Sequence, residues 1–303
     1  MKNKKICHPL QSGYIRRYTL SDGKETGLKV VELDNGVLRV LLNESKALDI
    51  MQVWYQGVNM SFVSKNGFTA REIPFGKRFE GGMLYTCGLD SIGGRPGFEP
   101  HGSLHNTPAK VIAMTQDEEK LQVTALVEHT ALFGANLVLE RTLTLNIRDS
   151  KLLLEDTLRN NGTKPEDYCV LYHTNFGYPM LDEGVEIIAD VSSVIPRGDH
   201  AARNLENRTV FPAPKDNEEE SCYFLENNSD RVLLLNKKLG NKITYSYSRD
   251  TLPALVQWNS PASQDYVLGI EPGSCFLDDQ FAYKQVAPGE DVRFYIQLEF
   301  EKI

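Results

Sequence analysis

Cysteine is scarce in this sequence, and its few copies stand far apart. Five cysteines occur among 303 residues, an odd number, and no two of them form a C-x-x-C pair. This pattern excludes a framework of disulfides and a zinc ribbon. We therefore expect separate reduced thiols and a cytoplasmic location.

Long apolar runs and an excess of basic residues are also missing. No run approaches the ~18 consecutive apolar residues of a membrane span, and the residues after Met1–Lys5 lack the apolar stretch of a signal peptide. The chain has 33 Lys and Arg residues against 41 Asp and Glu residues, which gives a net charge of −8. Because nucleic acids and anionic membranes both attract basic surfaces, we expect neither as a partner.

Helical periodicity is nearly absent, whereas the alternation typical of β-strands recurs along the chain. Apolar and polar residues alternate over 142–148, 243–248 and 293–300, and Asn35-Gly36 separates two further runs in the manner of a hairpin turn. A period of two places one face of a strand in a core and the other in water. The sequence therefore predicts an all-β fold, a large antiparallel domain with less than about a tenth helix.

No internal repeat and no linker of low complexity interrupts the chain. Large β-sandwiches reach this length around one core. We expect a single domain over residues 1–303, in which residues 1–27 form an N-terminal arm.

Two long stretches, 76–108 and 196–221, show no strand pattern and are expected to be loops. The second contains the acidic run Glu218-Glu219-Glu220, which is typical of a solvated loop. Long loops inside a compact domain usually carry function. We therefore look for a site in the first loop and at the strand ends near residues 173 and 271.

Two histidines stand close together in the first loop. His101 and His105 lie between Glu99 and Pro108, where Pro and Gly residues make a helix unfavourable. In an extended chain the two imidazoles can share a face, so a metal site is one interpretation. No third ligand stands nearby in the sequence, although a protein metal site needs about three or more. We expect no metal at these residues.

His173 and Glu271 each stand at the end of an apolar, strand-like run. His173 is followed by Asn175 and flanked by tyrosines, a setting that suits a polar, planar ring substrate but is equally that of a packed core histidine. Glu271 is followed by Pro272, which fixes it at the rim of its strand. A carboxylate there is either capped by backbone N–H groups or held as a base with a raised pKa.

Taken together, these segments resemble the aldose 1-epimerase (galactose mutarotase-like) superfamily. The short motifs that carry the resemblance are His101-Gly102, His173-Thr174 at a strand end, Glu271 at a strand end, and Pro288-Gly289-Glu290 before the last strand. The longer strings at 81–89, 106–109 and 172–179 look like a poorly characterised branch, known only as a domain of unknown function related to aldose epimerases. The resemblance covers roughly residues 29–300.

The resemblance implies a large twisted β-sandwich and an enzyme that interconverts the anomers of a sugar without a cofactor. By analogy with the family, Glu271 is the base that takes the proton of the anomeric hydroxyl, and His173 is the acid that protonates the ring oxygen. His101 matches the second histidine, which binds the sugar near the ring oxygen. Arg78, just before Gly81-Gly82, resembles the substrate-binding arginine of the family with its spacing shifted by two residues.

The sequence departs from the family pattern after His101, where Ser103-Leu104-His105 replaces the usual Gly or Arg. His105 is therefore either an additional substrate contact or the functional histidine in place of His101. The family also uses an Asp between its His and Glu segments. Asp199 and Asp216 both fall in that interval, and Asp199 is taken as the candidate.

The expected partner is a small-molecule carbohydrate, and Asn106 and Asn175 complete the expected sugar-binding set. No cluster of arginines indicates a phosphate pocket. Two alternatives remain open. One is a carbohydrate-binding protein without catalysis on the same fold, and the other is a metal-dependent sugar isomerase or lyase that uses His101, His105, His173 and Glu271. The oligomeric state is not assigned.

Overall fold

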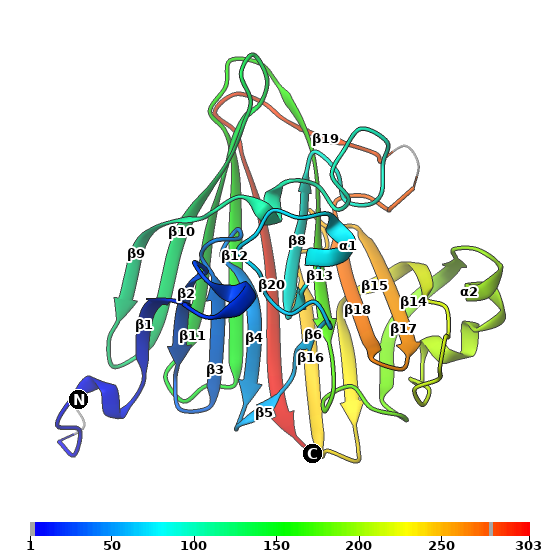
Figure 1. Ribbon diagram of the computed structural model, residues 1–303, viewed down its shortest axis with the longest axis horizontal. Coiled ribbons are helices and arrows are strands. Elements are labelled where there is room, and N and C mark those ends of the chain that lie inside the picture. The colour runs from blue at the N-terminus through cyan, green and yellow to red at the C-terminus, as the bar shows by residue number, and fades with distance from the viewer. Residues whose placement is uncertain (1–3, 279–280) are drawn as a thin grey trace.

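The computed structural model describes residues 4–278 and 281–303 (Figure 1). The predicted all-β fold is confirmed, because 53% of the residues lie in strands and 7% in helices. The strands are β1 (Tyr14–Thr19), β2 (Lys29–Asp34), β3 (Leu38–Asn43), β4 (Asp49–Tyr55), β5 (Val58–Asn59), β6 (Phe62–Val63), β7 (Gly81–Gly82), β8 (Leu84–Leu89), β9 (Lys110–Gln116), β10 (Lys120–Thr130), β11 (Asn136–Asn146), β12 (Lys151–Asn160), β13 (Glu166–Phe176), β14 (Glu186–Pro196), β15 (Ser221–Asn236), β16 (Asn241–Tyr247), β17 (Ala254–Ala262), β18 (Asp265–Gly273), β19 (Lys284–Val286) and β20 (Asp291–Lys302).

Helical elements are short. They are the α-helices α1 (Phe75–Arg78) and α2 (Asp199–Arg203), and the 3₁₀ turns η1 (Pro9–Gln11), η2 (Gly23–Glu25), η3 (Leu104–Asn106) and η4 (Leu205–Arg208). None of the helices within the described residues has the length and apolar character to span a membrane.

The strands form two main antiparallel sheets. Five strands pair in the order β1-β2-β3-β4-β5, and a 13-stranded sheet follows the order β19-β13-β18-β17-β15-β16-β20-β12-β11-β10-β9, with β14 joined to β15 and β8 to β13. One hydrophobic cluster contains buried side chains of both sheets, such as Val31 and Val40 from the first and Leu143 and Leu298 from the second. The two sheets therefore pack face to face as a β-sandwich.

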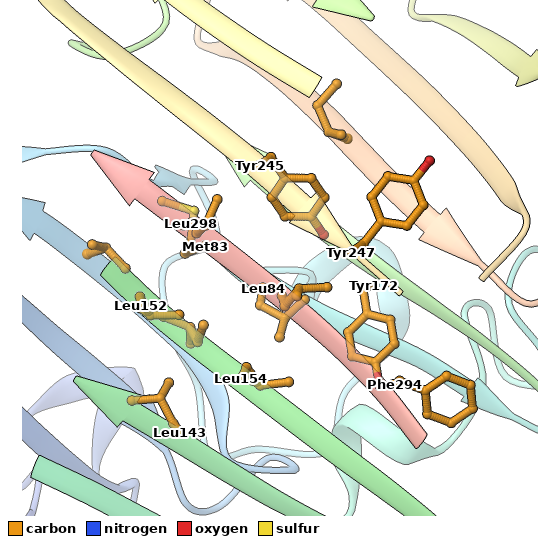
Figure 2. Close-up of a cluster of buried hydrophobic side chains, with 14 of the residues drawn as sticks. Met83, Leu84, Leu143, Leu152, Leu154, Tyr172, Tyr245, Tyr247, Phe294 and Leu298 are labelled. Atoms are coloured by element: carbon orange, nitrogen blue, oxygen red, sulfur yellow. The ribbon is translucent and has the colours of Figure 1, made fainter. Parts of the chain in front are cut away.

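The hairpin expected at Asn35-Gly36 forms between β2 and β3. The side-chain Oδ1 of Asn35 accepts hydrogen bonds from the backbone N–H groups of Val37 and Leu38, and Gly36 takes a φ of 86°. Strands β10, β11 and β12 then alternate buried and partly exposed residues along most of their length. Figure 2 shows the result in the core, where leucines of β11, β12 and β20 lie together with aromatic residues of β13 and β16.

Two sequence-based expectations differ from the structure in detail. The stretch 76–108, expected to be a loop, contains the six-residue strand β8. Every residue of β8 is buried, so the strand has no solvent face and shows no alternation in its sequence. Within the expected arm 1–27, residues Tyr14–Thr19 form β1, which pairs with β2 and is fixed by hydrogen bonds from Tyr14 and Tyr18 to Glu32.

Candidate active site

His173 and Glu271 lie opposite each other on neighbouring strands. Strands β13 and β18 are antiparallel, with Thr174 paired to Ile270 and Leu171 to Gly273, so the same register sets His173 against Glu271. Directly opposed residues of an antiparallel pair project from the same face of the sheet. Accordingly, Nε2 of His173 lies 3.2 Å from Oε1 of Glu271.

Burial pushes both groups towards their uncharged forms. The side chain of His173 is 5% exposed and that of Glu271 is 2% exposed. Burial, aided by the Glu220 carboxylate, raises the pKa of Glu271 well above its usual value. Burial, with a smaller contribution from the neighbouring His101, lowers the pKa of His173 to about 3. Burial therefore disfavours the charged form of each member of the pair.

The pair has spare hydrogen-bonding capacity. Oε1 of Glu271 and Nδ1 of His173 are both buried, and neither has a hydrogen-bond partner within the described residues. The 3.2 Å contact between the two side chains therefore lacks the alignment of an N–H···O hydrogen bond. Buried polar atoms are rarely left unpaired, so these two atoms are suited to hydroxyl groups of a ligand.

A cavity of about 580 Å³ opens beside the pair. His101, His173 and Glu271 line it together with the aromatic side chains of Phe79 and Trp258. Its volume lies within the ~300–1,000 Å³ range of ordinary ligand pockets. Aromatic faces with a few convergent polar groups are the surroundings that a sugar ring requires.

The loop between β8 and β9 turns sharply to bring His101 into this cavity. His101 has a φ of 64° and Gly102 a φ of 79°. A Cβ atom on Gly102 would lie 2.3 Å from the carbonyl oxygen of Ser91, so only glycine fits there. The His101 ring centre lies 5.5 Å from that of His173. Burial lowers the pKa of His101 to about 4, and its Nδ1 lies 3.1 Å from the carbonyl oxygen of Ile92.

His105 lies away from the cavity, in a buried group of charged side chains. Its Nδ1 is 2.6 Å from Oδ2 of Asp49, its Nε2 is 3.1 Å from Oε1 of Glu80, and its ring stacks on Tyr85 at 3.6 Å between centres. Burial acts to lower the pKa of His105, but Glu80 and Asp49 outweigh it and raise the pKa. His105 is thus held as a cation by two carboxylates.

The same group extends to Arg141, whose side chain is fully buried. Its guanidinium forms a bidentate ion pair with Asp156, with N···O distances of 2.9 and 2.7 Å, and a second ion pair with Asp49. Nζ of Lys46 lies 3.7 Å from Oε2 of Glu80 at the other end. Charged groups of opposite sign alternate through this cluster, which joins β4, β8, β11 and β12. Of these strands, β8 pairs with β13, the strand that carries His173.

Four other residues are expected from the sequence to bind the sugar. None of them is among the described residues that line the cavity. Arg78 is buried, donates to the carbonyl oxygen of Ile73 at 2.9 Å and pairs with Glu99. Oδ1 of Asn106 accepts a hydrogen bond from Lys46, and Nδ2 of Asn175 donates to the carbonyl oxygen of His173. Asp199 is exposed at the start of α2. The structure therefore brings together His101, His173 and Glu271.

Several cavity residues carry no clear signal in the sequence. Trp258 lines the cavity from β17, and its only sequence hint is that tryptophan occurs twice in the chain. Glu218 and Glu220 also line the cavity, although the acidic run to which they belong is expected to be solvated. Glu219, between them, has 78% of its side chain exposed. Within residues 4–278 and 281–303, no group of three or more His, Cys, Asp or Glu side chains is arranged to hold a metal ion.

The sequence profile of one family, described as Domain of unknown function (DUF4432), matches residues 25–299. The chain belongs to this family. No protein with a curated description matches the sequence. The DUF4432 match covers the strands and loops that supply His101, His173 and Glu271.

Solved structures place this DUF4432 member in the galactose mutarotase-like fold, as the motifs predict. A candidate aldose 1-epimerase from Klebsiella pneumoniae subsp. pneumoniae MGH 78578 superposes with a TM-score of 0.85 at 23% identity, covering 95% of this chain and 83% of that one. A galactose mutarotase-like protein from Clostridium acetobutylicum gives 0.70 at 15% identity, with 97% and 100% covered. A galactose 1-epimerase from Lactobacillus acidophilus NCFM gives 0.65 at 15% identity, with 96% and 98% covered.

Proposed function

We propose that this protein is an isomerase that interconverts the anomers of a free sugar or sugar derivative. The observation that carries the proposal is the meeting of His173, Glu271 and His101 in one aromatic-lined cavity. A base and an acid placed on the same face of a sheet can act on the two oxygen atoms of one anomeric centre. The fold shared with proteins named as aldose 1-epimerases supports the same reaction class.

In the proposed reaction, Glu271 takes the proton of the anomeric hydroxyl while His173 gives a proton to the ring oxygen. The bond between C1 and the ring oxygen breaks, and C1 becomes an aldehyde carbonyl. Rotation about C1–C2 presents the other face of the carbonyl, and the ring closes with both proton transfers reversed. No electrons leave the sugar and both side chains return to their starting state, so the reaction needs no cofactor. Each positioned proton transfer contributes ~10²–10⁴ in rate.

The single proton of the pair is sufficient for this chemistry. In the proposed resting state Glu271 carries the proton and His173 is neutral, which is the direction in which burial shifts both pKa values. Once the two side chains are aligned, transfer of this proton to His173 produces the carboxylate base and the imidazolium acid without any exchange with solvent. Hydroxyl groups of a bound sugar stabilise these charged forms by hydrogen bonding to the atoms that are otherwise unpaired.

His101 is assigned the binding of the sugar near its ring oxygen. Its Nδ1 faces the carbonyl oxygen of Ile92, which favours the neutral tautomer with the proton on Nδ1. Nε2 is then an acceptor for a sugar hydroxyl. A neutral His101 also avoids repulsion when the neighbouring His173 becomes charged.

NMR exchange spectroscopy on a panel of free monosaccharides tests the proposal. Wild-type protein should accelerate the exchange between α- and β-anomer signals of at least one sugar above the buffer rate. Binding of a sugar without acceleration would reject the isomerase and leave a carbohydrate-binding protein on the same fold.

A further inference from the structure

His173 lacks the hydrogen bond that commonly orients a catalytic imidazole. In many active sites the second ring nitrogen donates to a carboxylate or carbonyl, which fixes both the tautomer and the ring plane. Here Nδ1 of His173 has no hydrogen-bond partner within the described residues. Its ring is instead held by packing against other rings, among them Phe79 at 5.7 Å, His101 at 5.5 Å and Trp258 at 5.3 Å between centres.

The Trp258 ring is fixed by a hydrogen bond to a neighbouring side chain. Its indole Nε1–H donates to Oε2 of Glu220 at 2.8 Å. The ring meets His173 nearly at right angles, with 73° between the planes. On β17, Trp258 pairs with Gly269 of β18, so its side chain projects from the same face of the sheet as Glu271, two residues after Gly269.

We propose that Glu220 and Trp258 form a positioning pair: the Glu220 carboxylate fixes the indole through Nε1–H, and the indole holds the His173 ring beside Glu271. The pair replaces the missing hydrogen bond on Nδ1 of His173. Glu220 stands directly before β15, and the cavity wall around it includes the charged or titratable side chains of Arg197, Glu218, Cys222 and Glu271. The kinetic part of this inference rests on the proposed function, whereas its spectroscopic part does not.

A spectroscopic test uses the fact that the chain has two tryptophans. The spectrum of ¹⁵N-labelled protein should show two indole N–H signals, and the signal lost in Trp258→Phe identifies Trp258. Glu220→Gln should shift the Trp258 signal, because the hydrogen-bond acceptor changes from a carboxylate to an amide. The signal of Trp54, the other tryptophan, should stay in place. Glu219→Gln is the matched control. This substitution removes the same charge one residue away, and Glu219 does not line the cavity. If the Trp258 signal does not shift in Glu220→Gln, or shifts equally in the control, the proposed positioning pair is wrong.

A kinetic test separates positioning from sugar binding. Glu220→Ala and Trp258→Phe should each lower kcat by about 10-fold or more with little change in KM, because the loss is one of alignment. Glu220→Gln should recover most of the rate, since its amide oxygen still accepts from the indole. The double variant Glu220→Ala/Trp258→Phe should be no slower than the slower single variant, because both changes break one hydrogen bond.

Two kinetic results would contradict the inference. A raised KM with an unchanged kcat in Glu220→Ala would mean that Glu220 contacts the sugar directly. Multiplied losses in the double variant would mean that Glu220 and Trp258 act separately. If wild-type protein catalyses no anomer exchange at all, the proposed function fails, and the indole spectra still decide whether Glu220 fixes Trp258.

Discussion

The carboxylate of Glu271 lies in space that Gly269 leaves empty. A Cβ atom on Gly269 would stand 2.4 Å from Oε1 of Glu271 and 3.2 Å from Cβ of Trp258. The two residues are two positions apart on β18, so their side-chain directions point to the same face of the sheet. Gly269 is not needed here for a left-handed backbone conformation. It is needed because any side chain would displace the carboxylate.

Gly269→Ala should therefore lower kcat while the protein remains folded. The new methyl group forces the Glu271 carboxylate away from His173, and a misplacement of about 1 Å can cost ~10²-fold in rate. Rates come from NMR exchange spectroscopy, and circular dichroism checks the fold. In a Glu271→Gln background the same change should cost little more, since the displaced group is already inactive. An independent, multiplied loss in that background would place the effect of Gly269 elsewhere.

Glu271→Gln should slow anomer exchange by about 10²-fold or more while sugar binding persists. Glutamine keeps the shape and most hydrogen bonds of the side chain but cannot take the proton. His173→Asn should act in the same way, and the double variant should be scarcely slower than either single one. Saturation-transfer NMR reports binding in the same samples. Full exchange activity in Glu271→Gln would reject the mechanism.

Exchanging His101 and His105 for asparagine should produce different defects. His101 lines the cavity, so His101→Asn should reduce turnover. His105 lies between Asp49 and Glu80, so His105→Asn leaves two buried carboxylates without their shared cation and should lower the free energy of unfolding by about 3–5 kcal/mol. Urea unfolding measures the loss of stability, and exchange kinetics measure the loss of turnover, in both variants. A well-folded His105→Asn protein without activity would point to His105 as the functional histidine.

Stability should fall as the pH is lowered from 7 to 5, in part because of His101. Its pKa is lowered from 6.5 to about 4 by burial, so in this window the unfolded chain binds a proton that the folded protein does not. The free energy of unfolding therefore decreases as the pH drops, by up to about 2 kcal/mol for this residue. Urea titrations at the two pH values should show a smaller decrease in His101→Asn than in wild type. Equal decreases would mean that His101 titrates normally in the folded state.

Arg141→Met should strongly destabilise the protein. Burial acts to raise the pKa of Asp49, but Arg141 and His105 outweigh it and keep the carboxylate charged. Without Arg141, the Asp49 and Asp156 carboxylates remain buried and lack their main cation, which costs about 3–5 kcal/mol. Arg159→Met is the matched control, because Arg159 is 40% exposed and its pairs are worth about 1 kcal/mol or less. Similar urea midpoints for the two variants would show that the buried group does not hold the sheets together.

The sequence by itself determined the fold class and singled out His173 and Glu271 as candidates. Alternation in strands such as β11 and β20 reports directly which face meets the core, since the period of a strand is fixed by its backbone. His173 and Glu271 stood out because each combines a titratable side chain with the end of an apolar run. The sequence does not predict strand β8, because burial on both faces removes the alternation on which such a prediction depends.

Only the tertiary structure decided which side chains share the cavity. The register between β13 and β18 places His173 opposite Glu271, and the pairing of β17 with β18 brings Trp258 beside them. Such registers depend on packing between segments far apart in the chain, which no local pattern encodes. The same long-range packing places His105 between Asp49 and Glu80, away from the cavity that His101 lines, although the two histidines are four residues apart in the sequence.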